Sequence, residues 1–135
     1  MSEKTLKVKN VTEFVKTVHD MDVQYVDFNF TDLRGKMHRI TQHINTIDKD
    51  LMENGIYFDG SSIDGWKAIN ESDMALIPDS STAVMDPFSA QPSMIVFCDI
   101  MEPTTGQSYG RDPRSITKKA NTYLASTGIG DTSYF

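Results

Sequence analysis

The chain has 135 residues, 39% of them apolar and 24% charged, and these proportions are those of one globular domain with a sizeable core. Its 13 Lys and Arg stand against 19 Asp and Glu, and the net charge of −6 argues against nucleic acid or a membrane surface as a partner, because both attract concentrated positive charge. The single cysteine, Cys98, excludes an internal disulfide and a cysteine metal cage. The longest apolar run, residues 94–98, is far too short to cross a bilayer, so we expect a cytoplasmic protein.

The first predicted elements are a helix and a strand. Apolar residues at helical spacing between Val11 and Met21 predict the helix, and Asn10 with Glu13 can form a capping pair at its start. Apolar and polar residues then alternate from 26 to 30, which predicts a strand with one buried and one exposed face.

A turn, a return strand and a second helix are predicted next. Residues 32–35 have the composition of a turn, and 37–41 are predicted to be the second strand of a hairpin. A short helix is predicted over 49–54, with Gly55 adopting the left-handed conformation that ends it. The glycines and serines of 58–70 predict an ordered loop without regular structure.

The second half of the chain predicts three strands and the longest helix. The strands cover 74–77, 83–85 and 93–101, and the last is apolar nearly throughout, which is typical of a central strand. Asp112 as N-cap and Pro113 at the first helical position begin the helix, and a glycine ends it. Its predicted apolar stripe and terminating glycine are Ile116, Ala120, Tyr123, Leu124 and Gly128.

Together these elements predict an α+β fold with a mixed sheet, one longer helix and one or two short helices. Residues 132–135 have the pattern of a further strand, so we expect the full-length protein to continue past Phe135. We divide the chain into an N-terminal extension (1–10), a sheet-containing domain (11–110), and a helix with a first strand leading into a following domain (111–135).

An ordered series of local motifs is more specific than these periodicities. It consists of FDGSSI (58–63), GWK (65–67), INESDM (69–74), PD (78–79), STAV (81–84), DPF (86–88), CDI (98–100), RDPRSI (111–116) and STGI (126–129). In order and spacing, this series resembles the N-terminal β-grasp domain of type I (bacterial-type) glutamine synthetases. Asp64 and Ala68 depart from the pattern, because many members have glycine at both positions.

The resemblance implies an activity for the full-length protein. Members of the family join ammonia to the side chain of glutamate, and they use ATP to form a γ-glutamyl phosphate first. The family's next segment, expected after Phe135, supplies glutamate ligands for Mg²⁺ or Mn²⁺, so we expect no metal site in this chain. The family also implies a homo-oligomer of two stacked six-membered rings, a dodecamer, in which the β-grasp domain completes the active site of the neighbouring subunit.

The resemblance assigns roles to six residues around the first motif. Asp59 is expected to bind ammonium and accept its proton in the adjacent subunit's site, and Ser62 to bind ammonium beside it. The expected substrate-loop and interface residues are Gly60, Ser61, Trp66 and Asp73. Without the surrounding match, the Asp-Gly-Ser-Ser tetrad is typical of a plain tight turn.

Several alternatives stay open from the sequence. Trp66 fits a core anchor as well as a cover for the site, and Asp73 fits a strand-start turn as well as a loop facing a neighbouring subunit. The histidines lack a metal-ligand pattern, and we interpret them as surface or strand-edge residues; they are His19, His38 and His43. The chain as a whole also fits a stand-alone β-grasp binding module or a regulatory subunit.

Overall fold

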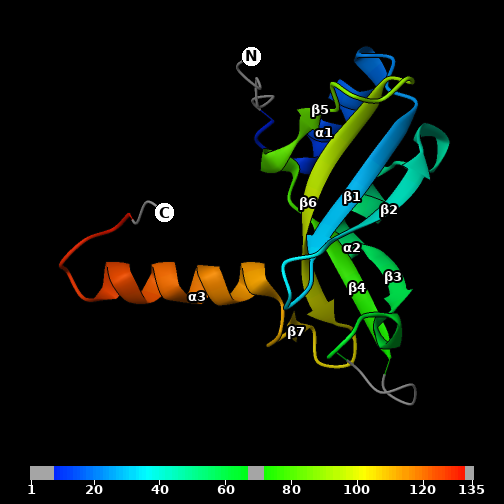
Figure 1. Cartoon of the computed structure of the whole chain (residues 1–135). Helices are drawn as coiled ribbons and strands as arrows, with labels where there is room; N and C mark the ends of the chain where they lie inside the picture. Colours follow the sequence, from blue (N-terminus) through cyan, green and yellow to red (C-terminus); the bar gives the residue numbers. More distant parts are fainter. Residues whose placement is uncertain (1–7, 67–71, 133–135) are drawn as a thin grey trace.

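The computed structural model of the chain describes residues 8–66 and 72–132. Its helices and strands are α1 (Val11–Asp20), β1 (Tyr25–Thr31), β2 (Met37–His43), α2 (Lys49–Asn54), β3 (Ile56–Asp59), β4 (Asp73–Pro78), β5 (Val84–Met85), β6 (Ser93–Glu102), β7 (Gln107–Ser108) and α3 (Pro113–Ser126) (Figure 1). Short 3-10 turns lie at η1 (Ile44–Thr46), η2 (Gly60–Ser62) and η4 (Ser80–Thr82). The described residues therefore confirm the predicted α+β class. No helix among them is long and apolar enough to span a membrane.

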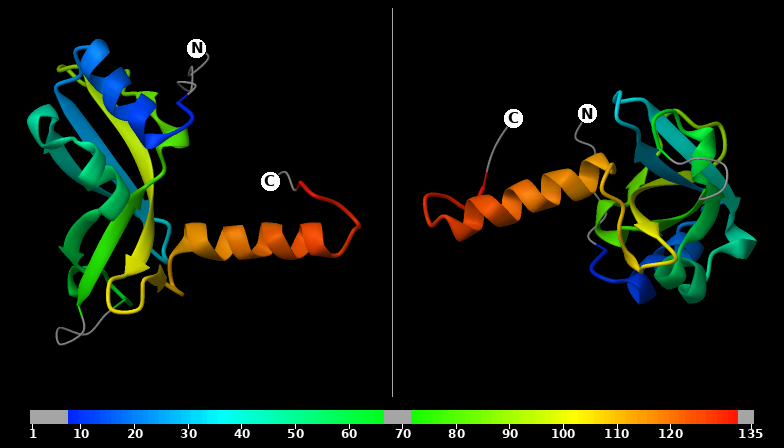
Figure 2. Two further views of the ribbon diagram at one scale, coloured as in Figure 1. Left: turned by 180° about the vertical axis from the view of Figure 1, so that it is seen from behind. Right: turned by 90° about the horizontal axis from the view of Figure 1, so that it is seen from below.

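The sheet is mixed, and β6 lies at its centre as predicted. The strand order is β2-β1-β6-β4-β3, with β5 and β7 pairing to the two ends of β6. β1 and β6 run parallel, and every other described pairing is antiparallel. The helices α1 and α2 cover one face of the curled sheet, whereas α3 extends away from it (Figure 2). The core lies between the sheet and the two covering helices, and includes Phe14, Phe28, Met52 and Leu76.

Strand β1 is buried on both faces, so the prediction of a half-exposed strand was wrong. Asp27 and Asn29, on the polar face, are only 5% and 9% exposed. The strand lies between β2 and β6, and the side chains of β2 cover its polar face. Thr41 donates a hydrogen bond to Asp27 at 2.6 Å, and the Arg39 guanidinium lies 3.5 Å from the same carboxylate.

The predicted loop 58–70 contains more regular structure than expected. Phe58 and Asp59 belong to strand β3, where they pair with Met74 and Asp73 of β4. The turn η2 follows directly, and the predicted residues 67–70 lie outside the described part of the chain. Sequence analysis assigned Phe58 and Asp59 to the loop because the glycines and serines that follow them have low strand propensity.

Helix α2 ends where predicted, and the glycine behind it is required for two reasons. Gly55 has φ 86° and ψ −177°, so the positive φ is confirmed, although ψ is extended rather than left-handed helical. A Cβ atom on Gly55 would also lie 2.3 Å from the backbone oxygen of Leu76, in β4. The close approach of α2 to β4 therefore admits only glycine.

The ends of the other helices follow their predicted caps. The Asn10 side chain accepts the N–H of Glu13 at 2.9 Å, but the Glu13 carboxylate accepts the N–H of Lys9 instead of completing a reciprocal box. Asp112 caps α3, and Gly128 follows that helix with φ 71°.

Helix α3 exposes the apolar stripe that the sequence predicts for it. Ile116 is 47% exposed and Tyr123 is 72% exposed. Ser115, in the first turn, is the buried residue of the helix. Figure 1 shows the reason, since α3 leaves the sheet and no other described element runs along it.

Candidate functional site: the Asp59 turn

The candidate site is the turn that follows β3, and Asp59 organises it. One carboxylate oxygen of Asp59 accepts hydrogen bonds from the N–H of Ser61 at 2.9 Å and from its hydroxyl at 2.6 Å. The N–H of Gly60 donates to the backbone oxygen of Ser72 at 2.6 Å, which ties the turn to the start of β4. The Asp59 side chain is thus held in one orientation while it remains exposed.

These contacts favour the ionised form of Asp59. The hydroxyl of Ser61 makes the largest contribution in lowering the pKa of Asp59 below 3.8, and the Ser61 N–H adds to it. The solvation that the carboxylate loses to its neighbours opposes this shift, and a hydrogen bond from the Ser72 side chain supports it. An oriented, ionised carboxylate is suited to bind a cation by charge-assisted hydrogen bonds.

A second carboxylate lies directly opposite on the neighbouring strand. Asp59 and Asp73 are partners in the antiparallel pairing of β3 with β4, and both are exposed. Like charges placed opposite each other in a sheet repel. Within residues 8–66 and 72–132, neither aspartate forms an ion pair with a lysine or arginine. The described surroundings therefore leave the negative charge of the turn uncompensated.

The other residues of the motif differ in how they face solvent. Ser62 is exposed beside Asp59, and Ser61 is half-buried because it donates to the Asp59 carboxylate. Gly60 is buried and is not one of the glycines with positive φ, so the turn does not require a left-handed backbone at this position. The structure thus brings Asp59 and Ser62 to the same exposed turn.

Trp66 lies beneath this turn, in the core. It is 7% exposed, and its ring centroid is 5.9 Å from that of Phe30, 6.4 Å from that of Phe58 and 5.3 Å from that of Tyr109. Its indole N–H is buried and has no hydrogen-bond partner. The side chain therefore anchors the end of the loop, and a role for Trp66 at the site entrance stays a prediction.

Arg111 holds the backbone of the loop after the Asp59 turn, and sequence reasoning missed it. Its guanidinium donates to the backbone oxygens of Gly65 and Trp66, from a segment 45 residues further along the chain. Arg111 is the first residue of the RDPRSI motif, so the sequence did single out its segment. Nothing local in the sequence indicates that this motif contacts the loop.

A second turn repeats the geometry of the first with a different electrostatic outcome. One carboxylate oxygen of Asp79 accepts the N–H of Ser81 at 3.1 Å and its hydroxyl at 2.6 Å. The other oxygen accepts a hydrogen bond from the Arg114 guanidinium at 2.8 Å. The charge of Asp79 is thus compensated within the domain, and this turn is a structural element rather than a candidate binding site.

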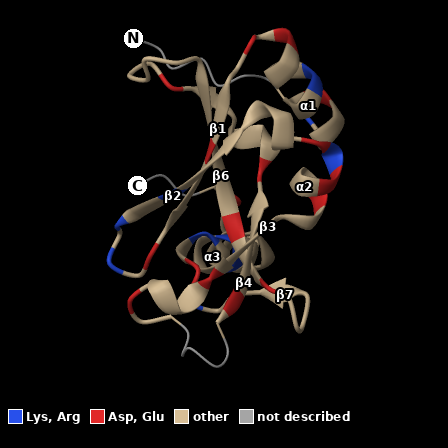
Figure 3. Ribbon diagram, turned by 90° about the vertical axis from the view of Figure 1, so that its right-hand side faces the viewer, with Lys and Arg blue, Asp and Glu red and all other residues tan. Residues whose placement is uncertain are grey.

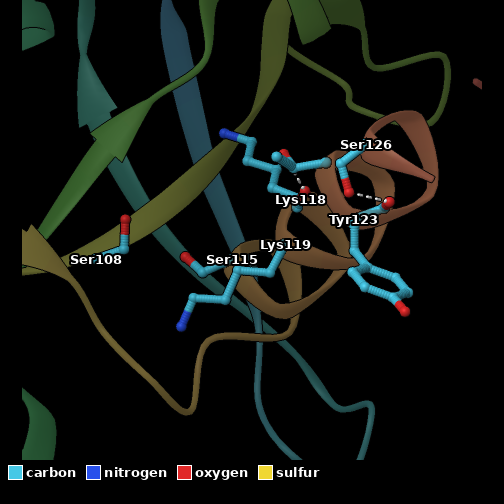
Figure 4. Close-up of a pocket in the computed structure, with 7 residues that line it drawn as sticks. Ser108, Ser115, Lys118, Lys119, Tyr123 and Ser126 are labelled. Carbon is cyan, nitrogen blue, oxygen red and sulfur yellow. Dashed lines mark hydrogen bonds between the residues drawn. The ribbon is translucent and has the colours of Figure 1, made fainter. Parts of the chain in front are cut away.

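The hollow along α3 does not have the chemistry of a binding site for anions. It is lined by Ser108, Ser115, Lys118, Lys119, Thr122, Tyr123 and Ser126 (Figure 4). The hydroxyls of Ser115 and Ser126 donate to Asp112 and to a backbone oxygen, respectively. Lys118 is paired with Asp99, and Figure 4 shows that the two lysine side chains point in different directions.

The histidines have structural surroundings. His38 lies 2.9 Å from the Asp32 carboxylate and stacks on Phe30, next to the turn that connects β1 and β2. His43 accepts the N–H of Asn45 at the start of η1. Across the described residues, no group of three His, Cys, Asp or Glu side chains is arranged to hold a metal ion.

The sheet, with helices on one face and an exposed acidic turn at the end of β3, defines a β-grasp domain. The family model described as "Glutamine synthetase, beta-Grasp domain" matches residues 22–103. The chain belongs to the glutamine synthetase family, and it contains the β-grasp domain of that family.

Relatives and a solved structure agree with this assignment. Glutamine synthetase from Azospirillum brasilense is 57% identical over 128 residues, which cover 95% of this chain and 27% of the relative. A Cupriavidus pinatubonensis protein named 3-hydroxylaminophenol mutase is 50% identical over 127 residues, covering 94% of this chain and 27% of that protein. The Plasmodium falciparum glutamine synthetase structure aligns with a TM-score of 0.86 at 27% identity, covering 95% of this chain and 25% of the other. The chain thus spans about a quarter of the length of these proteins.

Proposed function

We propose that the chain is the ammonium-binding half of a glutamine synthetase active site. The full-length protein would convert ATP, L-glutamate and ammonia to L-glutamine, ADP and phosphate. The description of the matching family model and the names of most relatives favour this ligase reaction over the mutase activity named for one relative. The observation that carries the proposal is the oriented carboxylate of Asp59, which no lysine or arginine among residues 8–66 and 72–132 pairs with.

The chemistry of ammonia explains why a carboxylate is needed at this position. At neutral pH ammonia is mostly ammonium, whose nitrogen cannot attack while its lone pair is protonated. An ionised carboxylate binds the cation by charge-assisted hydrogen bonds and can then accept its proton. The lowered pKa of Asp59 keeps it charged for binding, and the exposed hydroxyl of Ser62 offers a neutral acceptor beside it.

The remaining parts of the reaction belong to other parts of the full-length protein. We assign ATP, glutamate and the Mg²⁺ or Mn²⁺ ions to the large domain of a neighbouring subunit, as the family resemblance implies. Such an arrangement requires a homo-oligomer, and we propose the two-ring dodecamer in the cytoplasm. Asp59 would then act in the site of the adjacent subunit, which agrees with its exposure on this domain.

Kinetics of the full-length protein with Asp59→Asn test the proposal. Asparagine keeps the shape of the side chain but removes its charge and its capacity to accept a proton. We expect kcat/KM for ammonium to fall on the order of 10²–10⁴-fold, while the KM values for ATP and glutamate stay unchanged. Ser62→Ala should act in the same direction more weakly, because it removes only a neutral acceptor.

The matched control is Asp79→Asn, which changes the same turn chemistry at the compensated position. We expect this variant to lower kcat/KM for ammonium no more than it lowers kcat/KM for ATP and glutamate. A normal ammonium dependence and maximal rate for Asp59→Asn would contradict the proposal and leave Asp59 with the role of a turn residue.

A further inference from the structure

Apolar packing does not determine the direction in which α3 leaves the sheet. In the described structure, no side chain of the helix beyond Ser115 is buried. Ile116 and Tyr123, which belong to its apolar stripe, are largely exposed. A helix attached only at one end would swing about its first turn unless specific contacts fixed it there. The contacts that hold α3 must therefore lie within its first two turns.

The start of α3 is fixed by a buried aspartate. Asp112 is 1% exposed, and one of its carboxylate oxygens accepts the N–H of Ile100, in β6, at 3.0 Å. The same oxygen accepts the hydroxyl of Ser115 at 2.8 Å. These bonds attach the N-cap residue of the helix to the central strand. A single attachment of this kind fixes a position but leaves the helix free to rotate about it.

Arg114 supplies the contacts that remove this freedom. Its Nε donates to Asp99 of β6 at 3.0 Å, and its Nη2 donates to Asp79 at 2.8 Å. The two carboxylates come from different segments, the central strand and the turn before η4. A planar guanidinium held at two points fixes orientation as well as position, which a single ammonium group cannot do.

A second basic residue strengthens the same contact. Lys118, one turn further along α3, donates to the second oxygen of Asp99. Figure 3 shows acidic and basic segments of the ribbon meeting where α3 joins the sheet. Arg114 is 30% exposed and both carboxylates are of similar exposure, so water and salt only partly screen the cluster.

We propose that Arg114 is a positioning residue that fixes the direction of α3 relative to the sheet by bridging Asp79 and Asp99. The Asp59 turn belongs to the same sheet through β3 and β4. Whatever segment of the full-length protein follows α3 is consequently held at a defined orientation to that turn. This last consequence rests on the proposed function, whereas the fixed direction of α3 does not.

Distance measurements between spin labels test the proposal on the 135-residue chain. Labels attached to cysteines at Glu53, in α2, and Ala125, in α3, report the helix direction, because both positions are exposed. Cys98 is fully buried and should not be labelled in the folded protein. We expect a narrow distance distribution, which Arg114→Gln should broaden about twofold or more because both bridging bonds are lost. Arg114→Lys should have an intermediate width.

The matched control is Lys119→Gln, which removes a positive charge from the same helix at a residue without an ion pair in the described structure. It should leave the distribution unchanged. Hydrogen exchange of β6 in Arg114→Gln should stay at the wild-type rate, which separates positioning from general stability. In unsubstituted α3, raising NaCl from about 0.05 to 1 M should also broaden the distribution, because the cluster is partly exposed.

Two results would overturn the proposal. One is an unchanged width in Arg114→Gln, and the other is broadening accompanied by faster exchange throughout β6. If Arg114→Gln does not fold, the salt titration decides alone, and a width independent of salt would reject the positioning role. None of these measurements uses ammonium or ATP, so a failure of the proposed function would leave their outcome interpretable.

Discussion

The turns at Asp59 and Asp79 have the same local structure but different electrostatic surroundings. In each, the aspartate accepts the N–H and the hydroxyl of the serine two residues further on, Ser61 or Ser81. Asp79 is also bound by Arg114, whereas no described lysine or arginine pairs with Asp59. The Asp-x-Ser pattern thus determines the turn, and the packing of distant segments determines whether its charge is available to a ligand.

The two turns also differ in how firmly the sheet holds their backbones. The Asp79 N–H donates to Phe97 of the central strand β6, and the N–H of Phe97 donates in turn to the hydroxyl of Thr82. The Asp59 turn instead extends β3, which among the described strands lies at the edge and pairs with β4 alone. Edge segments open locally at a lower free energy than central ones.

The largest expected difference between the two regions is therefore in hydrogen exchange. Amides from Phe58 to Ile63 should exchange on the order of 10²-fold or more faster than those of Asp79 and of residues 94–100, because they need only local opening. Native-state exchange followed by NMR measures this in the 135-residue chain. Equal protection of the two turns would contradict the comparison.

A smaller difference is expected in thermal stability. Asp79→Ala removes a cap and the partner of a half-buried arginine, so it should cost about 1–2 kcal/mol, or about 3–6 °C in Tm. Asp59→Ala removes the same type of cap but none of the ion pairs found among the described residues, and it relieves the repulsion with Asp73. Its Tm should therefore fall less than that of Asp79→Ala. Calorimetry of both variants measures the difference.

The serines provide the control for this comparison. Ser61→Ala and Ser81→Ala remove equivalent hydroxyl bonds from the two turns, so their effects on Tm should be similar. If Asp59→Ala and Asp79→Ala lowered Tm equally, the ion pair with Arg114 would contribute nothing to stability, and the two turns would differ only in exposure.

Much of the fold could be predicted because its elements have strong local signals. The caps at Asn10 and Asp112, the apolar run of β6 and the positive φ at Gly55 are each encoded within a few residues. The polar residues of β1 were placed wrongly because alternation alone does not reveal that side chains of β2 cover the second face. The exposure of the apolar stripe of α3 could not be predicted for a similar reason. Helical periodicity indicates an apolar face, but it does not indicate whether another element covers that face.

The candidate site shows the same division between local and distant information. The ordered motifs identified the family and singled out Asp59, yet the feature that distinguishes it from Asp79 is a contact between residues 35 positions apart. Likewise, the bonds from Arg111 to the loop at Gly65 join segments that are distant in sequence. Such pairings depend on the sheet topology, which periodicity does not supply.

The two carboxyl groups should also differ in how salt affects their titration. Both pKa values lie below 3.8 in the folded chain, so each group adds stability that is present above that pH and is lost as the pH falls through its folded-state pKa. The causes differ. For Asp59 the hydroxyl of Ser61 dominates, whereas for Asp79 burial raises the pKa and is outweighed by the Ser81 bonds together with the charges of Arg114 and Lys118.

Because hydrogen bonds from a neighbouring hydroxyl are hardly screened by ions, and salt also weakens the repulsion from Asp73, the pKa of Asp59 should not rise between about 0.05 and 1 M NaCl. The pKa of Asp79 should rise toward 3.8 over that range, since the attraction of the Arg114 guanidinium is partly exposed to solvent. NMR titration of the two carboxyl carbons at low and high salt measures both groups in one sample.

Arg114→Gln should raise the pKa of Asp79 and abolish most of its salt dependence, while leaving Asp59 unaffected. A salt-dependent rise for Asp59 equal to that of Asp79 would mean that a cation of the chain also compensates the Asp59 turn, and that the two turns do not differ in the charge they offer to a ligand.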